Sequence, residues 1–470
     1  MLFNSFEYLA VFLPSVFILF FLASLTGRAT LARLMLVLAS LFFYAYWKLG
    51  YLPLLLASIA VNYSIGSFLR REGESPLRRP ALWLGVTFNL GLLGYYKYAD
   101  FLIGNINALA GTEIALSHLL LPLAISFYTF QQIAFLVDAY RGRVAAPGFL
   151  NYCLFVCFFP QLIAGPIVHH SKMVPQFNRD DFLRIDVDNL RVGLFLIAIG
   201  FFKKTVLADA LVPLVGSGFA GAAGLPPHEV ALVILAYTFQ LYFDFSGYTD
   251  MAMGAARCFN IRLPLNFSSP YRSRNIREFW RRWHITLNDF MTRYVYGPLR
   301  GDARSGKRPL VAIFITFVLV GVWHGAGWNF VLFGILHAVA VVFVTVMAGR
   351  LDFLAERVAI AITFLFFVLS LVLFRSADAE AAFAMYRALF DFSYYLSPIA
   401  TPAAASTLVI SALDIALIIG CALLCFCARN SNELSADVRL QARMLPLTMA
   451  LFIIALSINT SSSEFIYFNF

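Results

Sequence analysis

Thirteen apolar segments dominate the sequence, and most of them are long enough to cross a lipid bilayer. They lie near residues 8–25, 31–47, 51–69, 81–98, 115–138, 149–166, 191–215, 229–255, 309–324, 328–348, 358–374, 407–428 and 444–458. A membrane-spanning helix needs about 20 apolar residues, whereas a membrane β-strand needs about ten with alternating polarity. Because only helices and closed barrels satisfy the backbone in hydrocarbon, these long runs predict helices. We therefore expect an all-α, polytopic integral membrane protein.

The composition agrees with this class. Hydrophobic residues make up 61% of the 470 residues and charged residues 13%. Soluble domains contain about 45–50% apolar and about 25% charged residues. The first run, Tyr8–Leu25, carries no charge and follows no basic region, so we expect a retained first helix and not a cleaved signal peptide. No soluble module interrupts the pattern, and a single membrane domain over residues 1–470 is predicted.

Basic residues predict the orientation in the membrane. The connections after the first, third and fifth runs are rich in arginine: Arg28, Arg33, Arg70, Arg71, Arg78, Arg79, Arg141 and Arg143. Cytoplasmic loops carry such an excess, which places the N-terminus outside and these loops in the cytoplasm. The net charge of +9 fits the same bias. Since no basic stripe is interleaved with stacking aromatics, no nucleic-acid partner is predicted.

The run at 149–166 does not fit a simple crossing. Its end reads "FFPQLIAGPIV", with Pro160, Gly165 and Pro166, which are poor residues for a continuous helix. If this run enters and returns on the same side, the strongly basic stretch 270–308 falls in the cytoplasm. We therefore predict a re-entrant segment at 149–166 and a cytoplasmic or interfacial segment at 270–308.

Among the charged residues of the apolar runs, we single out six as candidates. They are Asp138, Lys203, Lys204, Asp209, Asp244 and Asp250. A charge at membrane depth is costly and marks either a function or a specific partner. One interpretation is internal ion pairs that hold helices together. The other is a polar tunnel or a set of groups that orient catalytic residues, with Asp244 in "YFDFSGYTDMAMG" (242–254) at its densest point.

Two stretches pair tryptophan with histidine. In "GVWHGAGWNF" (321–330), glycines surround His324 and either allow helices to pack closely or allow a ligand to approach. In "EFWRRWHITLNDF" (278–290), helical spacing would place Trp280 and His284 on one face. The arginines around them, Arg277, Arg281 and Arg282, suit either lipid phosphates at an interfacial helix or an anionic donor. For His337, a further membrane histidine, we expect a packing role.

The sequence lacks the usual signatures of hydrolases, nucleotide-binding proteins and metalloproteases. There is no G-x-S-x-G, no P-loop, no Rossmann glycine pattern after a strand and no H-E-x-x-H. The six cysteines lie in apolar runs without histidines or carboxylates at ligand spacing, so no metal and no bound cofactor are predicted. What remains is a histidine base, which suits transfer of an already activated acyl group to a hydroxyl. A transporter or flippase is the alternative, although internal repeats and paired broken helices are not evident.

Several stretches together resemble one family, the membrane-bound O-acyltransferases (MBOAT), and most closely its bacterial branch that acts on polysaccharides such as alginate. They span nearly the whole chain in order: "ISFYTFQQIAFLVDAYRG" (125–142), "FFPQLIAGPI" (158–167), "YFDFSGYTDMAMGAARCFNIRLPLNF" (242–267), "SPYRSRNIREFWRRWHITLNDF" (269–290), "GVWHGAGWNFVLFGILHA" (321–338) and the terminal "FIYFNF". The resemblance implies a ring of about 11–13 transmembrane helices, with re-entrant or interfacial segments, around a central tunnel. It also implies that His324 is the catalytic histidine and that His284 is the second catalytic position.

The resemblance further implies a reaction and its partners. An acetyl group from a cytoplasmic thioester, acetyl-CoA or an acyl carrier protein, would cross the bacterial inner membrane to an exported polysaccharide such as alginate or cellulose. A periplasmic SGNH-like acetyltransferase, a polysaccharide synthesis or export complex and membrane lipid are the expected partners, with the terminal "FIYFNF" as an outward docking tail. Donor-binding or tunnel roles are expected for Arg277, Arg281, Arg282, Trp280, Trp323 and Asp244. The segment "NDFMTRYVYGPLRG" (288–301) departs from the alginate pattern, and D-alanyl transfer to teichoic acid is a further alternative.

Overall fold

The computed structural model describes residues 1–71, 75–144, 148–163, 165–221, 224–302, 306–350, 353–396, 408–459 and 465–466. These residues form helices and connecting loops, with no strand among them. The α-helices are α1 (Leu13–Leu25), α2 (Ala29–Trp47), α3 (Leu52–Leu69), α4 (Arg78–Leu93), α5 (Ala99–Ala110), α6 (Ile125–Tyr140), α7 (Phe149–Cys157), α8 (Phe159–Leu162), α9 (His170–Met173), α10 (Val187–Phe202), α11 (Val212–Ala220), α12 (Pro227–Cys258), α13 (Ile276–Arg282), α14 (Ile285–Met291), α15 (Gly297–Arg300), α16 (Lys307–His324), α17 (Trp328–Val346), α18 (Glu356–Arg375), α19 (Ala379–Leu389), α20 (Ser393–Leu396), α21 (Ala412–Cys427), α22 (Ser431–Ala436) and α23 (Val438–Ile458).

Short π- and 3₁₀-helices extend or join these elements. The π-helical turns are Glu7–Phe12, Gly94–Tyr98, Lys203–Ala208 and Thr292–Tyr296. The 3₁₀ turns are Leu49–Tyr51, Val174–Asn178, Asp180–Leu183, Asp209–Leu211 and Pro270–Arg272. π-Helical turns inside longer helices occur frequently at functional sites. In this chain three of them carry polar residues that matter below.

Seven helices of the described chain are long and apolar enough to cross a membrane. They are Glu7–Leu25, Ala29–Trp47, Leu49–Leu69, Pro227–Cys258, Lys307–His324, Trp328–Val346 and Glu356–Arg375. Two shorter apolar helices, Ala412–Cys427 and Arg443–Ile458, follow near the end of the sequence. The prediction of an all-α polytopic membrane protein is thereby confirmed. The expected number of eleven to thirteen crossings stays a prediction. It would include helices such as α6, whose 16 residues span only about 24 Å.

The core forms where α10 packs against α12, a helix of 32 residues. Glycines allow the two backbones to touch: a Cβ on Gly200 would lie 2.5 Å from the carbonyl oxygen of Gly247. One on Gly254 would lie equally close to the carbonyl oxygen of Gly193. Close approach of this kind is how small residues join helices in a membrane, where no hydrophobic force draws them together. Substitution of any of these glycines would therefore separate the two central helices.

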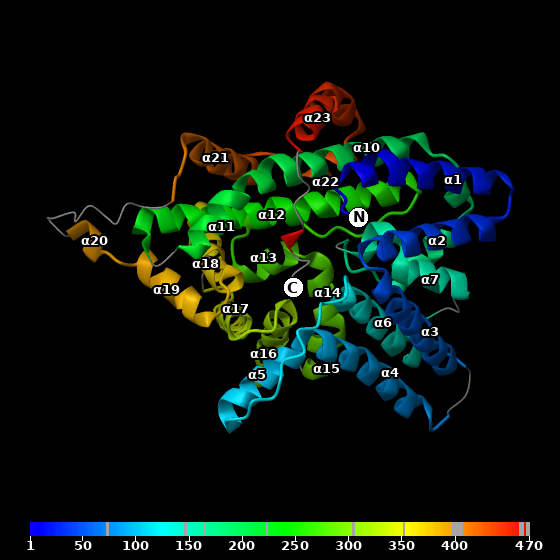
Figure 1. Cartoon of the computed structure of the whole chain (residues 1–470), viewed down its shortest axis with the longest axis horizontal. Helices are drawn as coiled ribbons and strands as arrows, with labels where there is room; N and C mark the ends of the chain where they lie inside the picture. Colours follow the sequence, from blue (N-terminus) through cyan, green and yellow to red (C-terminus); the bar gives the residue numbers. More distant parts are fainter. Residues whose placement is uncertain are drawn as a thin grey trace.

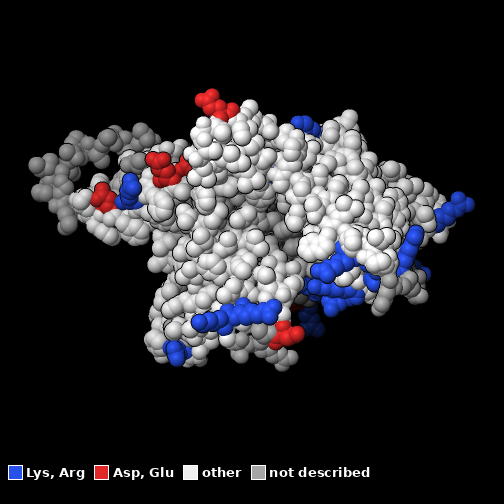
Figure 2. All heavy atoms as spheres, turned by 90° about the horizontal axis from the view of Figure 1, so that it is seen from below, with Lys and Arg blue, Asp and Glu red and all other residues white. Residues whose placement is uncertain are grey.

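The remaining helices surround a central group of short elements. Figure 1 shows α13 and α14 near the middle of the molecule, with α1 to α4 on one side and α17 to α19 on the other. Figure 2, a view at right angles, shows Lys and Arg side chains concentrated along one side of the molecule. The positive-inside rule predicts that this side faces the cytoplasm, and the orientation stays a prediction.

The segment predicted to be re-entrant forms two short helices, α7 and α8. The helix breaks at Phe158, whose φ of −51° and ψ of 113° are not helical. The nine residues of α7 are about 14 Å long and cannot cross a hydrocarbon core of about 30 Å. After α8 the chain returns to the end of α6, where His169 Nε2 lies 2.8 Å from Asp138 Oδ2. The break at Phe158 and the return of the chain to α6 fit a re-entrant segment. That residues 149–166 enter and leave the membrane on the same side stays a prediction.

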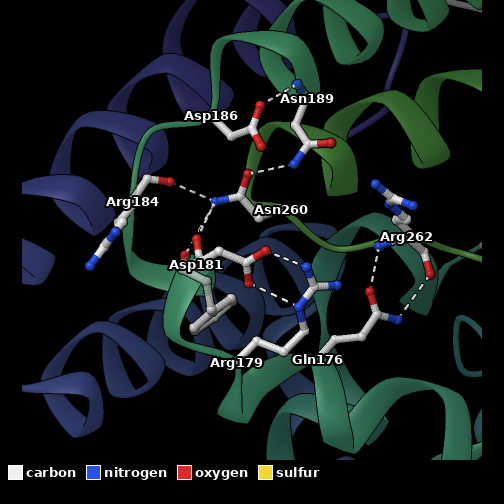
Figure 3. A network of polar contacts seen from close by, with 9 residues as sticks. Gln176, Arg179, Asp181, Arg184, Asp186, Asn189, Asn260 and Arg262 are labelled. Atoms are coloured by element: carbon white, nitrogen blue, oxygen red, sulfur yellow. Dashed lines mark hydrogen bonds and ion pairs between the residues drawn. The ribbon is translucent and has the colours of Figure 1, made fainter.

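A polar network fixes the loop that follows the re-entrant segment. Asn260, in the left-handed conformation at φ 61°, donates from its amide to the carbonyl oxygens of Asp181 and Arg184, at 2.9 and 2.6 Å. Its own carbonyl accepts from Asn189 at 2.9 Å. Figure 3 shows these contacts joining two chain segments. These contacts give residues 181–189 a defined conformation beside the end of α12.

Candidate active site

His324 is the last residue of α16 and is 2% exposed. Three aromatic rings enclose its imidazole: the ring centroids of Trp323, Phe374 and Phe333 lie 4.9, 5.0 and 6.0 Å away. The residues that follow, Gly325 to Gly327, make the turn into α17. The imidazole is therefore held in an apolar site at a helix end, where a neutral histidine can act as a base.

Lys97 and Tyr98, which sequence reasoning missed, hold this helix end. The last carbonyls of an α-helix lack partners within the helix and carry partial negative charge. Lys97 Nζ donates to the carbonyl oxygens of Trp323 at 2.5 Å and His324 at 3.3 Å, and the Tyr98 hydroxyl donates to Val322 at 2.8 Å. Both side chains come from the π-helical turn between α4 and α5. They fix the backbone, and so the direction of the His324 side chain.

His284 lies on the other side of the Trp323 indole, at 6.0 Å between ring centroids. It is fully buried, and its φ of 44° is in the left-handed region. Such a conformation is uncommon for a residue with a side chain and clusters at functional sites. His284 Nδ1 lies 3.1 Å from Asn266 Oδ1, which also accepts from the Thr286 hydroxyl at 2.9 Å. The accepting role of Asn266 places the imidazole proton on Nδ1 and the lone pair on Nε2. Burial lowers the pKa of His284, which keeps the imidazole neutral.

The prediction that Trp280 and His284 share one helix face is wrong. The left-handed His284 ends α13 and separates it from α14, so the two side chains diverge. The Trp280 indole N–H instead donates to His337 Nδ1 at 3.2 Å, and His337 Nε2 lies 3.0 Å from the Ser370 hydroxyl. These bonds join α13, α17 and α18. They give His337 the packing role that the sequence predicts, and they place Trp280 beside it.

Arg277, Arg281 and Arg282 line a groove of about 1040 Å³ between the end of α17 and the start of α18. Its other lining residues include Arg272, Arg274, Glu278, Glu356, Phe343, Val344, Ile362 and Phe366. Glu278 pairs with Arg282 at 2.6 Å and Glu356 pairs with Arg274 at 2.7 Å. Arg277 and Arg281 make no ion pair with the described residues. The groove thus offers two uncompensated guanidinium groups beside an apolar wall.

A second pocket, of about 300 Å³, lies at the opposite end of α17. It is lined by Tyr95, Tyr96, Lys97, Asp100, Leu119, Leu121, Gly325, Ala326 and Phe330. Gly325 directly follows His324. Since the 19 residues of α17 span about 28 Å, the basic groove and this pocket face opposite sides of the molecule. The candidate base lies at the pocket end.

The glycines around His324 serve helix packing. A Cβ on Gly321 would lie 2.4 Å from the carbonyl oxygen of Phe330 and 2.6 Å from the Cα of Gly334. One on Gly325 would overlap the Phe330 ring. Of the two interpretations left open by the sequence, contact between α16 and α17 is the one that these distances support. The glycines position His324 by letting the two helices touch.

Asp244 lies in an ion pair, 2.5 Å from Lys204 Nζ, with both side chains almost fully buried. Lys204 also pairs with Asp209 at 2.7 Å, and the neighbouring Lys203 pairs with Asp250 at 2.7 Å. The pairs of Lys204 with Asp244 and of Lys203 with Asp250 connect the π-helical turn after α10 to α12. The interpretation as internal ion pairs is therefore confirmed for these residues, and a donor-binding or tunnel role of Asp244 stays a prediction.

The C-terminal residues enter the core. Phe465 is 1% exposed and stacks on Tyr248 with ring centroids 4.6 Å apart. The backbone N–H of Ile466 donates to Asp244 Oδ2 at 3.1 Å. Phe465 also contacts Phe245, whose ring lies 4.9 Å from His284. For Phe465 and Ile466 the prediction of an outward docking tail is wrong, and residues 467–470 lie outside the described part.

These helices and buried histidines define a multi-pass membrane protein with a polar centre, and comparisons with known proteins give its class. A sequence model of the MBOAT, membrane-bound O-acyltransferase family matches residues 139–377. The peptidoglycan O-acetyltransferase of Helicobacter pylori is 38% identical, covering 100% of this chain and 98% of that protein. The probable alginate O-acetylase AlgI of Pseudomonas aeruginosa is 37% identical over 83% of this chain and 75% of its own. The teichoic acid D-alanyltransferase of Bacillus subtilis is 30% identical over 46% of this chain and 57% of its own.

The chain belongs to the membrane-bound O-acyltransferase family. It is a multi-pass membrane enzyme of the O-acyltransferase class. His324 and His284, both predicted from the sequence, lie on either side of Trp323.

Proposed function

We propose that the protein transfers an acetyl group from a cytoplasmic thioester to a hydroxyl group destined for an extracytoplasmic polysaccharide. The observation that supports this proposal is the buried His324, whose neighbour Gly325 lines a pocket at one end of α17 while a basic groove lies at the other end. The predicted orientation places the groove on the cytoplasmic side. A donor and an acceptor that never share a compartment could therefore meet at one imidazole.

The chemistry that suits His324 is general base catalysis. The acceptor oxygen forms a bond to the acyl carbon as the carbon–sulfur bond of the thioester breaks. His324 takes the hydroxyl proton and passes it to the departing thiolate, so that the free thiol and the acetyl ester leave. A base of this kind contributes about 10²–10⁴-fold to the rate. His284, with its lone pair on Nε2, assists or orients the acceptor from the other side of Trp323.

For the donor we propose acetyl-CoA or an acetylated carrier protein, because both present phosphate and a long pantetheine arm. The guanidinium groups of Arg277 and Arg281 suit phosphate through their fork geometry. The arm would then have to reach from the groove toward the far end of α17. Trp280 and Trp323 are the aromatic residues that we expect along this route.

For the acceptor we propose peptidoglycan first, because the relative so named aligns with the whole chain. Alginate and cellulose follow, and D-alanyl transfer to teichoic acid is the distant alternative, since that relative aligns with less than half of the chain. We further propose that the enzyme lies in the inner membrane of a bacterium. There a periplasmic SGNH-like acetyltransferase carries the acetyl group onward to the polymer, within a synthesis or export complex.

Inverted membrane vesicles test the proposal, because they present the cytoplasmic face to the medium. Acetyl-CoA with a labelled acetyl group is added to vesicles that contain the enzyme and a periplasmic fraction trapped inside. We expect covalently bound label in the lumen and release of free thiol outside. A transporter or flippase would instead move its substrate without transfer of the label, and that outcome would overturn the proposal.

Neutralisation of the two arginines without an ion pair tests the role of the groove in donor binding. We expect the double substitution Arg277→Gln and Arg281→Gln to raise the KM for acetyl-CoA by about tenfold or more, because hydrogen bonds to charged groups contribute about 1.5–3 kcal/mol each. The value of kcat should change far less, since neither residue is near His324. Arg179→Gln is the matched control: Arg179 is an exposed arginine of a loop on the cytoplasmic side that pairs with Asp181. Equal KM values in the double variant and the control would contradict a donor-binding groove.

A further inference from the structure

A second cluster of polar side chains lies at the end of α6, outside the histidine pair around Trp323. Asp138, His169 and His170 each offer one ligand atom, and these atoms all lie within 4.8 Å of one another. His169 Nε2 is 2.8 Å from Asp138 Oδ2, and the Tyr294 hydroxyl is 2.7 Å from each of these atoms. Three segments of the chain meet at this point.

The cluster contains buried polar atoms without partners. His170 is 5% exposed, and neither of its ring nitrogens makes a hydrogen bond with the part of the chain that the structure describes. Asp138 is 2% exposed, and its Oδ1 likewise makes none. An unsatisfied buried polar group costs about 1–3 kcal/mol, and a charged one costs more. Hydrogen bonds among the three side chains therefore account for only part of the cluster.

We propose that Asp138, His169 and His170 bind one divalent transition-metal ion, with zinc as the best match. Two imidazole nitrogens and one carboxylate oxygen are a donor set that zinc and similar ions take in proteins, with a fourth position open to water or another ligand. Tyr294 lies close enough to supply or orient that fourth ligand.

The neighbouring groups also fit a metal ligand. Ser171 Oγ lies 2.6 Å from His169 Nδ1. The Ser171 backbone N–H also donates to this nitrogen, at 3.3 Å. Binding of the ion through Nε2 would replace this long contact: the imidazole proton would lie on Nδ1 and the Ser171 hydroxyl would accept it, as outer partners of metal-bound histidines do. The sequence predicts no metal site because Asp138 is separated from the two histidines by the whole re-entrant segment. Only the return of that segment to α6 brings the ligands together.

The charge of Arg293 is unfavourable for a bound cation, and its substitution tests the proposed metal site. Its Nη1 lies 3.2 Å from His169 Nε2, where it would repel a cation. The side chain is exposed and can turn into solvent when an ion binds. We therefore expect Arg293→Gln to tighten zinc binding by about threefold or more, because it removes a like charge near the ion. Substitution of Asp138, His169 or His170 should instead weaken zinc binding.

The experiment uses the full chain, purified in detergent through a tag without histidine and dialysed against a small excess of zinc. We expect about one zinc ion per chain by elemental analysis, and less than about one fifth of that in His170→Ala and Asp138→Asn, since each variant leaves only two of the three protein ligands. His228→Ala, which removes an exposed histidine at the start of α12, is the control and should retain the ion. Zinc should raise the melting temperature of the wild type and of this control, but not that of His170→Ala or Asp138→Asn.

Two outcomes would overturn the proposal. One is a wild type that holds no more zinc than His170→Ala. The other is an Arg293→Gln variant, altered only at the surface, that binds zinc no more tightly than the wild type. The second outcome remains decisive if the buried variants fail to fold. Neither measurement depends on acyl transfer, so the metal site and the proposed reaction can fail separately.

Discussion

Replacement of His324 by glutamine is expected to lower the rate of acyl transfer by about 10²–10⁴-fold, because the acceptor hydroxyl loses its base. Glutamine is close to histidine in size, so the aromatic site formed by Trp323, Phe333 and Phe374 stays filled. The KM for the donor should change little, since the basic groove lies at the other end of α17. The measurement is label transfer from acetyl-CoA per amount of folded enzyme.

His337→Gln is the matched control for this substitution. His337 is a second buried histidine of the same helix pair, bonded to Trp280 and Ser370. Its loss should lower stability through these two hydrogen bonds, each worth about 0.5–1.5 kcal/mol, while the rate per folded molecule stays within a few-fold of the wild type. Equal loss of rate in both variants would show that His324 has no special role. Full activity of His324→Gln at normal protein levels would do the same.

Asp244→Ala should lower the free energy of unfolding by about 3–5 kcal/mol. The substitution leaves the Lys204 ammonium buried, and breaking one partner of a buried ion pair costs this amount. Asp209 remains beside Lys204 and is more exposed, so it compensates only in part. A second substitution tests the cause: the double variant Lys204→Met and Asp244→Leu removes both charges and should recover much of the loss.

Thermal unfolding of the detergent-solubilised protein measures this effect, with a thiol-reactive dye as the probe. Five of the six cysteines are buried and would react only as the core opens. The control is Asp188→Ala, which breaks the surface pair between Asp188 and Arg191. Surface pairs contribute about 0–1 kcal/mol. If Asp244→Ala unfolds at the same temperature as this control, the buried ion pair does not stabilise the core.

The helical class and the position of the candidate base could be predicted because both rest on local sequence. Apolar runs of sufficient length define membrane helices whatever their neighbours are. The Trp-His-Gly stretch ends α16 through its own glycine at Gly325. The sequence also indicated an ion pair for Asp244, since a charge at membrane depth requires a partner, although it did not identify Lys204 as that partner.

Other features depend on contacts between distant parts of the chain. The helix break at His284 follows from hydrogen bonds to Asn266, which hold a left-handed residue that helical spacing gives no reason to expect. Lys97 reaches the end of α16 across 226 residues of sequence. The clustering of Asp138 with His169 and His170 requires the re-entrant segment to fold back. No pattern within one segment encodes any of these three contacts.

Tyr248 connects the two extremes of the sequence. Its ring stacks on Phe3 and on Phe465, with centroids 4.6 Å away in each case, and Asn459 donates to the backbone of Asn4 at 2.8 Å. A ribosome adding about 5–20 residues per second takes on the order of ten seconds or longer to proceed from Tyr248 to Phe465. During that time Phe245, which packs against His284, lacks its contact with Phe465. Catalytic competence should thus arise after translation has passed residue 466, and prematurely terminated chains would insert into the bilayer without becoming active.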